Sequence, residues 1–147
     1  MYKRILVPLD GSRKAEAILP HVEVLSANLG SEIILLQVIG IGRAISAPHD
    51  AEIDVNARKE RAEQATDYLA GIGGELRAKG IEYQHFVEYG SAVDMIIQVA
   101  ERVGADLIAM ASHGRGGLSR VFYGSVAAGV TQQVDRPLLL IRSRRID

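Results

Sequence analysis

The sequence predicts an α/β protein in which helices cover both faces of a five-stranded parallel sheet, and three observations support this prediction. Five short apolar runs alternate with helical stripes along the chain. Gly30, Gly80 and Gly104 each close a stripe shortly before the next run begins. The 147 residues have the usual length of one domain, so we assign residues 1–147 to a single domain.

The five apolar runs are the expected strands. Four of them are nearly continuous in Ile, Leu, Val, Ala or Met, which is typical of strands buried on both faces of a parallel sheet. The third run mixes polar with apolar residues and therefore suits an edge strand. In chain order the runs cover residues 5–9, 33–39, 83–89, 107–111 and 138–141.

The segments between the runs have apolar residues at helical spacing. This spacing predicts three helices, and Ser91 followed by Asp94 predicts a capping box at the start of the third. A fourth, shorter helix is expected to begin near Gly124 and Ser125 and to stop before Pro137. The three stripes are Ile18, Leu19, Val22, Leu25 and Leu29; Ala62, Ala65, Leu69, Ile72 and Leu76; and Val93, Ile96, Ile97, Ala100 and Val103.

Three stretches interrupt the helical pattern. Pro20 falls inside the first stripe, where it should kink the helix because proline has no N–H to donate. Gly71, Gly73 and Gly74 should weaken or break the second helix. Residues 40–52 contain glycines and a proline without any periodicity, so we expect a long loop there.

The composition excludes several classes of function. With a formal net charge of -1 and a sequence pI of about 6.4, the chain has no excess of basic residues with which to bind nucleic acid or an anionic membrane. The lack of cysteine excludes disulfides, thiolate catalysis and cysteine metal sites. No apolar run approaches the roughly 20 residues of a membrane span, and no signal peptide is evident. We therefore expect a cytoplasmic protein with no nucleic-acid or membrane partner.

Residues that follow the strands are candidates for a binding site, because ligands of open parallel sheets bind beyond the carboxyl ends of the strands where the strand order reverses. Asp10 begins an Asp-Gly-Ser segment after the first run. A glycine-rich segment, 112–117, follows the fourth run and leads toward Gly124 and Ser125. Free amides at a helix N-terminus bind anions, so this loop is a candidate phosphate site. On its own the loop is equally consistent with a plain surface segment.

Two common phosphate-binding motifs do not match. The chain contains no Gly-Lys-Ser/Thr, which excludes a Walker A loop. Gly114-Arg115-Gly116 is a poor dinucleotide fingerprint, because it follows the fourth run and Ser119 stands where the third glycine should be.

Two other motifs resemble those of the universal stress protein (UspA-like) family. Residues 7–12 read Val-Pro-Leu-Asp-Gly-Ser, similar to the family's V-P-x-D-G-S at the end of the first strand. Gly114, nine further residues and then Gly124-Ser125 match three of the four positions of the family's G-x2-G-x9-G-[S/T] motif. Segments 115–118, 125–127 and 136–141 are also similar, so the resemblance covers essentially the whole chain. It implies a Rossmann-like fold of the adenine nucleotide alpha hydrolase type and ATP, with Mg or Mn, as the ligand.

The resemblance also implies roles for individual residues. Pro8, Leu9 and Asp10 would line the site, with the Asp10 carboxylate accepting hydrogen bonds from ribose hydroxyls or lying near a metal. Val38 would offer backbone groups and an apolar edge to adenine, and Met110 would flank the base. On the phosphate side the resemblance implies amides from Gly114, Gly124, Ser125 and Val126, with one more bond from the Ser125 hydroxyl. His113 and Arg115 are added as candidate phosphate contacts because they lie in the same loop.

Several of these residues also have a simpler explanation. Asp10 could cap the first helix or stabilise its own turn. Val38 and Met110 are plausible core residues with or without a ligand. His113 and Arg115 could be solvated loop residues.

Ala111 departs from the family motif, whose first glycine falls at this position. In the family the backbone there passes close to the nucleotide, beside the sugar and base. We therefore expect the added methyl group to weaken ATP binding rather than to abolish it.

The favoured function is an adenine-nucleotide-binding regulatory module of the stress response that acts as a dimer. The alternatives are a nucleotide-free dimeric interaction protein of the same fold and a slow ATPase. Ala111 favours the first alternative, because it replaces one glycine of the nucleotide-binding motif. No general base, nucleophile or base–orienter pair is evident, so we assign no catalytic residue. Two further classes of protein, the PP-loop pyrophosphatases and the response-regulator receivers, are set aside. Both require residues after the first strand that differ from Asp10 and its neighbours.

The last apolar run predicts the dimer interface. Leu138, Leu139, Leu140 and Ile141 are apolar at every position, and the last strand of a sheet built in this order is expected at an edge. A free apolar edge can pair with its own copy about a two-fold axis. The family resemblance points to the same strand.

Overall fold

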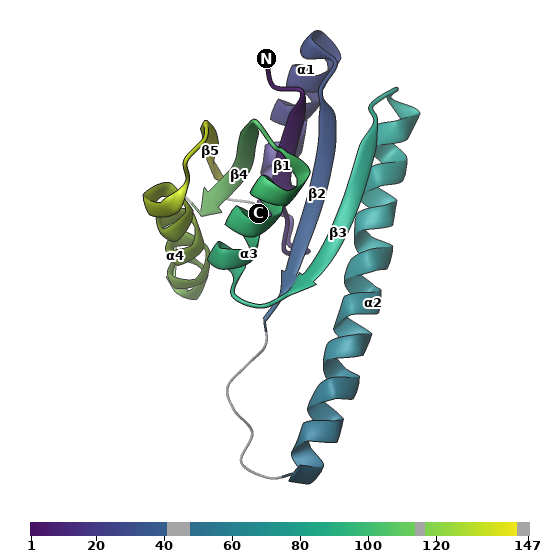
Figure 1. The fold of residues 1–147 in the computed structure, drawn as a ribbon, viewed down its shortest axis with the longest axis vertical. Helices are drawn as coiled ribbons and strands as arrows, with labels where there is room; N and C mark the ends of the chain where they lie inside the picture. The colour runs from purple at the N-terminus through teal and green to yellow at the C-terminus, as the bar shows by residue number, and fades with distance from the viewer. Residues whose placement is uncertain (41–47, 114–116, 144–147) are drawn as a thin grey trace.

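The computed structural model describes residues 1–40, 48–113 and 117–143, with side chains described outside 48–54, 113 and 117–123. Its elements are β1 (Arg4–Pro8), the 3₁₀ helix η1 (Ala15–Ile18), α1 (Leu19–Leu29), β2 (Glu32–Ile39), α2 (Pro48–Ala78), β3 (Tyr83–Tyr89), α3 (Ala92–Val103), β4 (Leu107–His113), α4 (Gly117–Gln133) and β5 (Leu138–Ser143). The five strands pair in parallel in the order β3-β2-β1-β4-β5 (Figure 1). The predicted five-stranded parallel α/β fold is therefore confirmed.

The strand order reverses beside β1. The chain runs from β1 through β2 to β3 at one edge, crosses back to β4 beside β1, and ends with β5 at the other edge. Because parallel crossovers are right-handed, α1 and α2 cover one face of the sheet while α3 and α4 cover the other. Figure 1 shows α3 and α4 in front of the strands and α1 behind them. The reversal leaves a crevice between the carboxyl ends of β1 and β4.

The core lies on both faces of the central strands. Each fully buried aliphatic side chain contributes about 1.5–3 kcal/mol to folding. Those from the strands include Ile5, Leu6, Ile33, Ile34, Leu35, Leu36 and Ile108, and helices add Ile18, Leu69, Leu76 and Ile96. The continuous apolar runs are explained by this two-sided burial.

Two predictions about helix interruptions are wrong. Pro20 lies in the first turn of α1 rather than inside it, because η1 takes up the residues before it, and a first-turn N–H has no intrahelical partner to lose. Helix α2 runs unbroken through the three glycines and begins at Pro48, inside the expected loop 40–52. Residues 41–47 of that expected loop lie outside the described part of the chain.

Gly73 shows why α2 tolerates its glycines. A Cβ built on Gly73 would lie 2.1 Å from two ring atoms of Tyr83 on β3. Only glycine lets the helix come this close to the strand, and the packing outweighs the cost of about 1 kcal/mol that glycine brings to a helix interior.

The predicted capping box of α3 is also not formed. Ser91 is the N-cap residue in extended conformation, but its side chain makes no capping hydrogen bond. The N–H of Met95 donates to the Ser91 carbonyl at 2.9 Å. Helix α3 thus begins where the motif indicated, held by the backbone alone. Within the described part of the chain, no helix combines the length and apolar character needed to cross a membrane.

Candidate functional site

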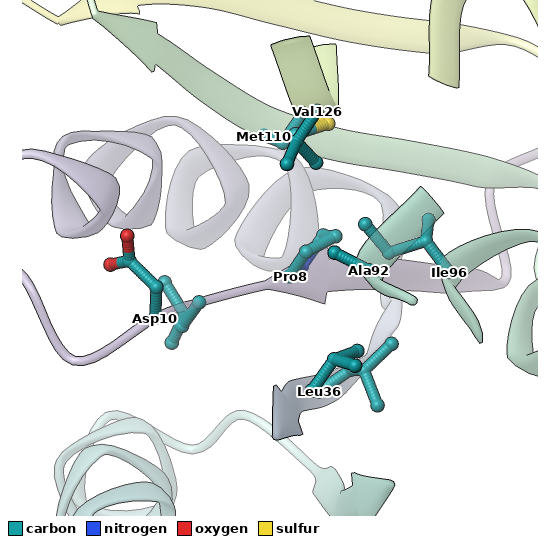
Figure 2. A pocket seen from close by; sticks show the side chains of 9 residues that line it. Pro8, Asp10, Leu36, Ala92, Ile96, Met110 and Val126 are labelled. Atoms are coloured by element: carbon teal, nitrogen blue, oxygen red, sulfur yellow. The ribbon is translucent and has the colours of Figure 1, made fainter. Parts of the chain in front are cut away.

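A cavity opens at the carboxyl ends of β1, β2 and β4, on the face covered by α3 and α4 (Figure 2). Its empty volume is about 490 Å³, including its open mouth. The lining is apolar except for Asp10, and it consists of Pro8, Leu9, Asp10, Leu36, Val38, Ala92, Ile96, Met110 and Val126. The cavity lies where the strand order reverses, which is the position expected for a ligand in this class of sheet.

The structure brings six of the predicted site residues together around this cavity. They are Pro8, Leu9, Asp10, Val38, Met110 and Val126. Three lining residues were not predicted. Leu36 shares a face of β2 with Val38 by the two-residue period of a strand, and Ala92 and Ile96 lie one turn apart on α3. The sequence shows these spacings, but they identify the three residues as lining residues only when the position of α3 over β1 is known. That position is set by the crossover from β3 to β4.

The backbone of Val38 faces the crevice. In β2 the even-numbered residues direct their N–H and C=O groups toward β1, as the 2.8 Å bond from Leu9 N–H to the Leu36 carbonyl shows. The odd-numbered residues face β3, where Gly90 N–H donates to the Ile39 carbonyl at 3.0 Å. The β1–β2 ladder ends with the Leu9 bond, so Val38 is left without a partner strand on the β1 side in the described structure. A hydrogen-bond donor and acceptor therefore lie side by side at the cavity.

Asp10 is held at the mouth of the cavity by its own turn. Its Oδ1 accepts a hydrogen bond from Ser12 N–H at 2.9 Å, and Ser12 Oγ accepts one from Ala15 N–H at 3.1 Å. Gly11 between them has φ of +87°, which glycine adopts without strain. The turn-stabilising role considered for Asp10 is thus observed. Asp10 is exposed at the mouth of the cavity.

Ala111 does not line the cavity. Successive side chains of a strand point to opposite faces, and Met110 points into the cavity, as Figure 2 shows. The Ala111 methyl group therefore points to the other face, where it is 1% exposed and η1 packs against β4. The expectation that this methyl group crowds the nucleotide is not supported by its position.

The fourth helix begins earlier than predicted. Helix α4 starts at Gly117, so Gly124 and Ser125 lie in its interior rather than at its N-terminus. A single glycine in a helix costs only about 1 kcal/mol, and no proline stops the helix between residues 117 and 124. The free amides of the helix thus belong to its first turn, after residue 116.

The remaining predicted residues are only partly visible. His113 is the last residue of β4, and the structure describes its backbone but not its side chain. Gly114 and Arg115 fall outside the described residues altogether. Among the residues that are described, no group of three or more His, Cys, Asp or Glu side chains could hold a metal ion.

Comparison with known proteins places the chain in a family. Residues 1–142 match the model of the universal stress protein family. The universal stress protein MJ0577 of Methanocaldococcus jannaschii is 29% identical over 157 residues that span 98% of this chain and 97% of that protein. Its solved structure covers 99% of both chains with a TM-score of 0.84 and 30% identity.

Two further solved structures share the fold at lower identity. An Arabidopsis thaliana protein of the universal stress protein family with AMP bound covers 97% of this chain and 92% of its own, with a TM-score of 0.65 and 19% identity. A universal stress protein in complex with cAMP covers 97% of this chain and 98% of its own, with a TM-score of 0.64 and 19% identity. With the family model spanning nearly its whole length and the predicted fold confirmed, the chain belongs to the universal stress protein family.

Proposed function

We propose that this protein is a regulatory module of the stress response that binds an adenine nucleotide, ATP foremost, in the cavity between β1, β2 and β4. The observation that supports this most directly is the pairing of an apolar slot with the N–H and C=O groups of Val38, which face away from β3 and have no partner strand among the described residues. Adenine presents a flat apolar surface and an edge with adjacent donor and acceptor groups, which is complementary to such a slot. The fold relatives with AMP or cAMP bound add support.

The other parts of the nucleotide follow from the position of the base. Asp10 at the cavity mouth is suited to accept hydrogen bonds from ribose hydroxyls. The phosphates would extend toward the first turn of α4, where free amides and the helix dipole favour negative charge. Mg or Mn would accompany the phosphates.

Filling the cavity tests the proposal. Ala92 lines the cavity from the first turn of α3, so Ala92→Phe should occupy the space of the base and weaken ATP binding at least tenfold. Isothermal titration calorimetry with Mg-ATP measures the effect. Gln98→Phe, on the exposed side of the same helix, is the matched control and should bind ATP normally. Equal ATP affinity in the two variants would contradict the proposed site.

Gly124 tests the phosphate side. Its amide can meet a phosphate only if the first turns of α4 open, because inside the helix it is bonded to a carbonyl four residues earlier. A Cβ on Gly124 meets nothing within 4 Å, so Gly124→Ala should fold and stabilise the closed helix by up to about 1 kcal/mol. We expect this to weaken ATP binding about 3–5-fold while AMP, which lacks the outer phosphates, binds unchanged. Equal loss for both nucleotides would argue against a phosphate role.

We further propose that two copies pair through β5 and that nucleotide occupancy is read by a partner of this dimer. Strand β5 lies at the open edge of the sheet, and Leu140 on it is 41% exposed. An exposed apolar edge strand favours pairing with another strand.

A further inference from the structure

A second hollow, the α2 cleft, lies between α2 and the ends of β1 and β2, and Tyr68 of α2 is one of the residues that line it. Its empty volume, including the part open to solvent, is about 1210 Å³. Asp10 and Val38 line both this cleft and the first cavity, so the two hollows meet at the end of β1. The turn that carries Asp10 therefore lies between the candidate site and α2.

The Tyr68 hydroxyl joins α2 to η1 across this cleft. It donates to Oε2 of Glu16 at 2.6 Å, and the bond is partly buried. A short hydrogen bond from a hydroxyl to a carboxylate is among the stronger kinds in proteins. The two residues are 52 positions apart in the chain. The bond thus holds two elements in a fixed relation that the local sequence does not impose.

Glu16 is joined in turn to the turn that carries Asp10. The Ser12 carbonyl accepts a hydrogen bond from Glu16 N–H at 3.3 Å, and Asp10 Oδ1 accepts one from Ser12 N–H at 2.9 Å. Helix η1 has only four residues, and a 3₁₀ helix this short has little stability of its own. The buried side chains of Ala15 and Ile18 anchor it to the core, and Tyr68 adds the bond from α2. A series of hydrogen bonds therefore runs from the mouth of the first cavity to α2.

Tyr68 also lies where α2 leaves the sheet. Among the described side chains of α2, Ala65 is the buried one nearest to the start of the helix. The side chains described at 55–64 are exposed or half-exposed. We call residues 48–64 the α2 arm, and in Figure 1 the beginning of α2 continues past the ends of the strands. The bond between Tyr68 and Glu16 therefore acts at the base of this arm.

Two other side-chain bonds of α2 do not involve the Asp10 turn. Arg61, on the arm, donates to the Gly40 carbonyl at 3.4 Å, which is long for a hydrogen bond. An ion pair of 2.9 Å joins Lys79, just after the helix, to Glu23 of α1. Of these three interactions, the one made by Tyr68 is the one that links α2 to the mouth of the first cavity.

We propose that the bond between Tyr68 and Glu16 couples the nucleotide site to the α2 arm. Tyr68 is a positioning residue, which acts through Glu16 and holds the Asp10 turn in the shape that forms the mouth of the cavity. Coupling between two sites is reciprocal, so a nucleotide seated against this turn also holds the base of the arm more firmly. This inference rests on the proposed function, and it identifies the α2 arm as the surface whose position depends on occupancy.

Removing the hydroxyl tests the positioning role. Tyr68→Phe keeps the ring and deletes the donor, so the affinity for Mg-ATP measured by calorimetry should fall about 3–10-fold, as expected for one hydrogen bond. Thr66→Val is the matched control, because the Thr66 hydroxyl donates within α2 to the Ala62 carbonyl at 2.9 Å, and it should bind ATP normally. Combining Tyr68→Phe with Glu16→Ala should weaken binding no more than the stronger single change, because both remove the same bond.

Spin labels on the arm and on α1 test the reciprocal effect. The chain has no cysteine, so Val24→Cys and Val55→Cys place two labels without any further change. Val24 on α1 is 62% exposed and Val55 on the arm is 57% exposed, so the labels disturb no core packing. Double electron–electron resonance gives the distribution of distances between them. Saturating Mg-ATP should narrow this distribution when Tyr68 is present and leave it unchanged when Tyr68→Phe is added.

The outcomes separate this inference from the proposed function. If ATP binds but its affinity is the same in Tyr68→Phe, or if the losses in the double variant add, the coupling is wrong. A distance distribution that ATP leaves unchanged, or narrows equally with and without the hydroxyl, also overturns it. Thermal melting without ligand checks that Tyr68→Phe is folded, and Glu16→Ala replaces it if it is not. If the unaltered protein binds no ATP, the proposed function fails and this inference fails with it.

Discussion

At the scale of single residues, one strand position decides whether a side chain lines the cavity. Met110 and Ala111 are neighbours in β4, yet Met110 lines the cavity and Ala111 is buried on the opposite face. The motif comparison treats both as site residues because it counts positions along the chain. The pleat of the strand separates them. The substitution of glycine by Ala111 is therefore a change in the core rather than in the lining.

Ala111→Gly tests this distinction. Nucleotide affinity should change less than twofold, because the methyl group points away from the cavity. The free energy of unfolding should fall by about 1–2 kcal/mol, from the lost buried methyl group and the greater freedom of glycine in a strand. Calorimetry and urea denaturation measure the two quantities. A clear gain in ATP affinity would restore the view that the methyl group crowds the ligand.

At the scale of elements, contacts between elements override local propensity. Glycines at 71, 73 and 74 would break an isolated helix, yet α2 passes through them as it packs on β3. The same applies to α4, which passes through Gly124 without a break. Where an element begins and ends is set by the neighbours it packs against as much as by its own residues.

Gly73→Ala and Gly71→Ala are a matched pair of variants that tests whether packing on β3 outweighs helix propensity in α2. Alanine at 73 would push against the Tyr83 ring and should destabilise the protein by about 1–3 kcal/mol despite its better helix propensity. Alanine at 71 meets nothing within 4 Å and should stabilise it by up to about 1 kcal/mol. Urea denaturation of both variants gives the comparison. A stabilising Gly73→Ala would mean that α2 and β3 are less closely packed than described.

At the scale of the whole molecule, the sheet has two edges of different character. The mixed strand β3 forms one edge and the apolar strand β5 the other, and both positions follow the expectation from the sequence. Ile108 N–H donates to the Pro137 carbonyl at 3.0 Å while Ile108 is in register with Leu138. In this register Leu139 directs its N–H toward β4, and Leu140 directs its N–H outward.

Leu140→Pro is therefore the substitution that tests the proposed dimer. It removes an outward donor and should give folded monomers, since proline is tolerated on the free side of an edge strand. Leu139→Pro removes a bond to β4 and should instead lower the melting temperature. Sedimentation equilibrium and thermal melting distinguish the two effects. Dimers that survive Leu140→Pro would place the interface elsewhere.

The sequence was sufficient for the number and type of strands, because burial on both faces leaves uninterrupted apolar runs. It was also sufficient for six residues that the structure gathers around one cavity, from Pro8 to Val126. It did not reveal Ala92 or Ile96, whose place depends on a crossover between distant strands. It misjudged the starts of α2 and α4, because a helix that is stabilised by packing can extend over residues that would not form one alone.

The length of α2 has a consequence for how the molecule moves in water. Its 31 residues make a rod of about 46 Å, and in Figure 1 it continues well past the ends of the strands it covers. Val55, in its first half, is 57% exposed. Such a projection raises the friction of a 15.9 kDa chain above that of a sphere of equal mass. Gel filtration would then overstate the mass of a monomer, so its elution volume alone could be mistaken for that of a dimer.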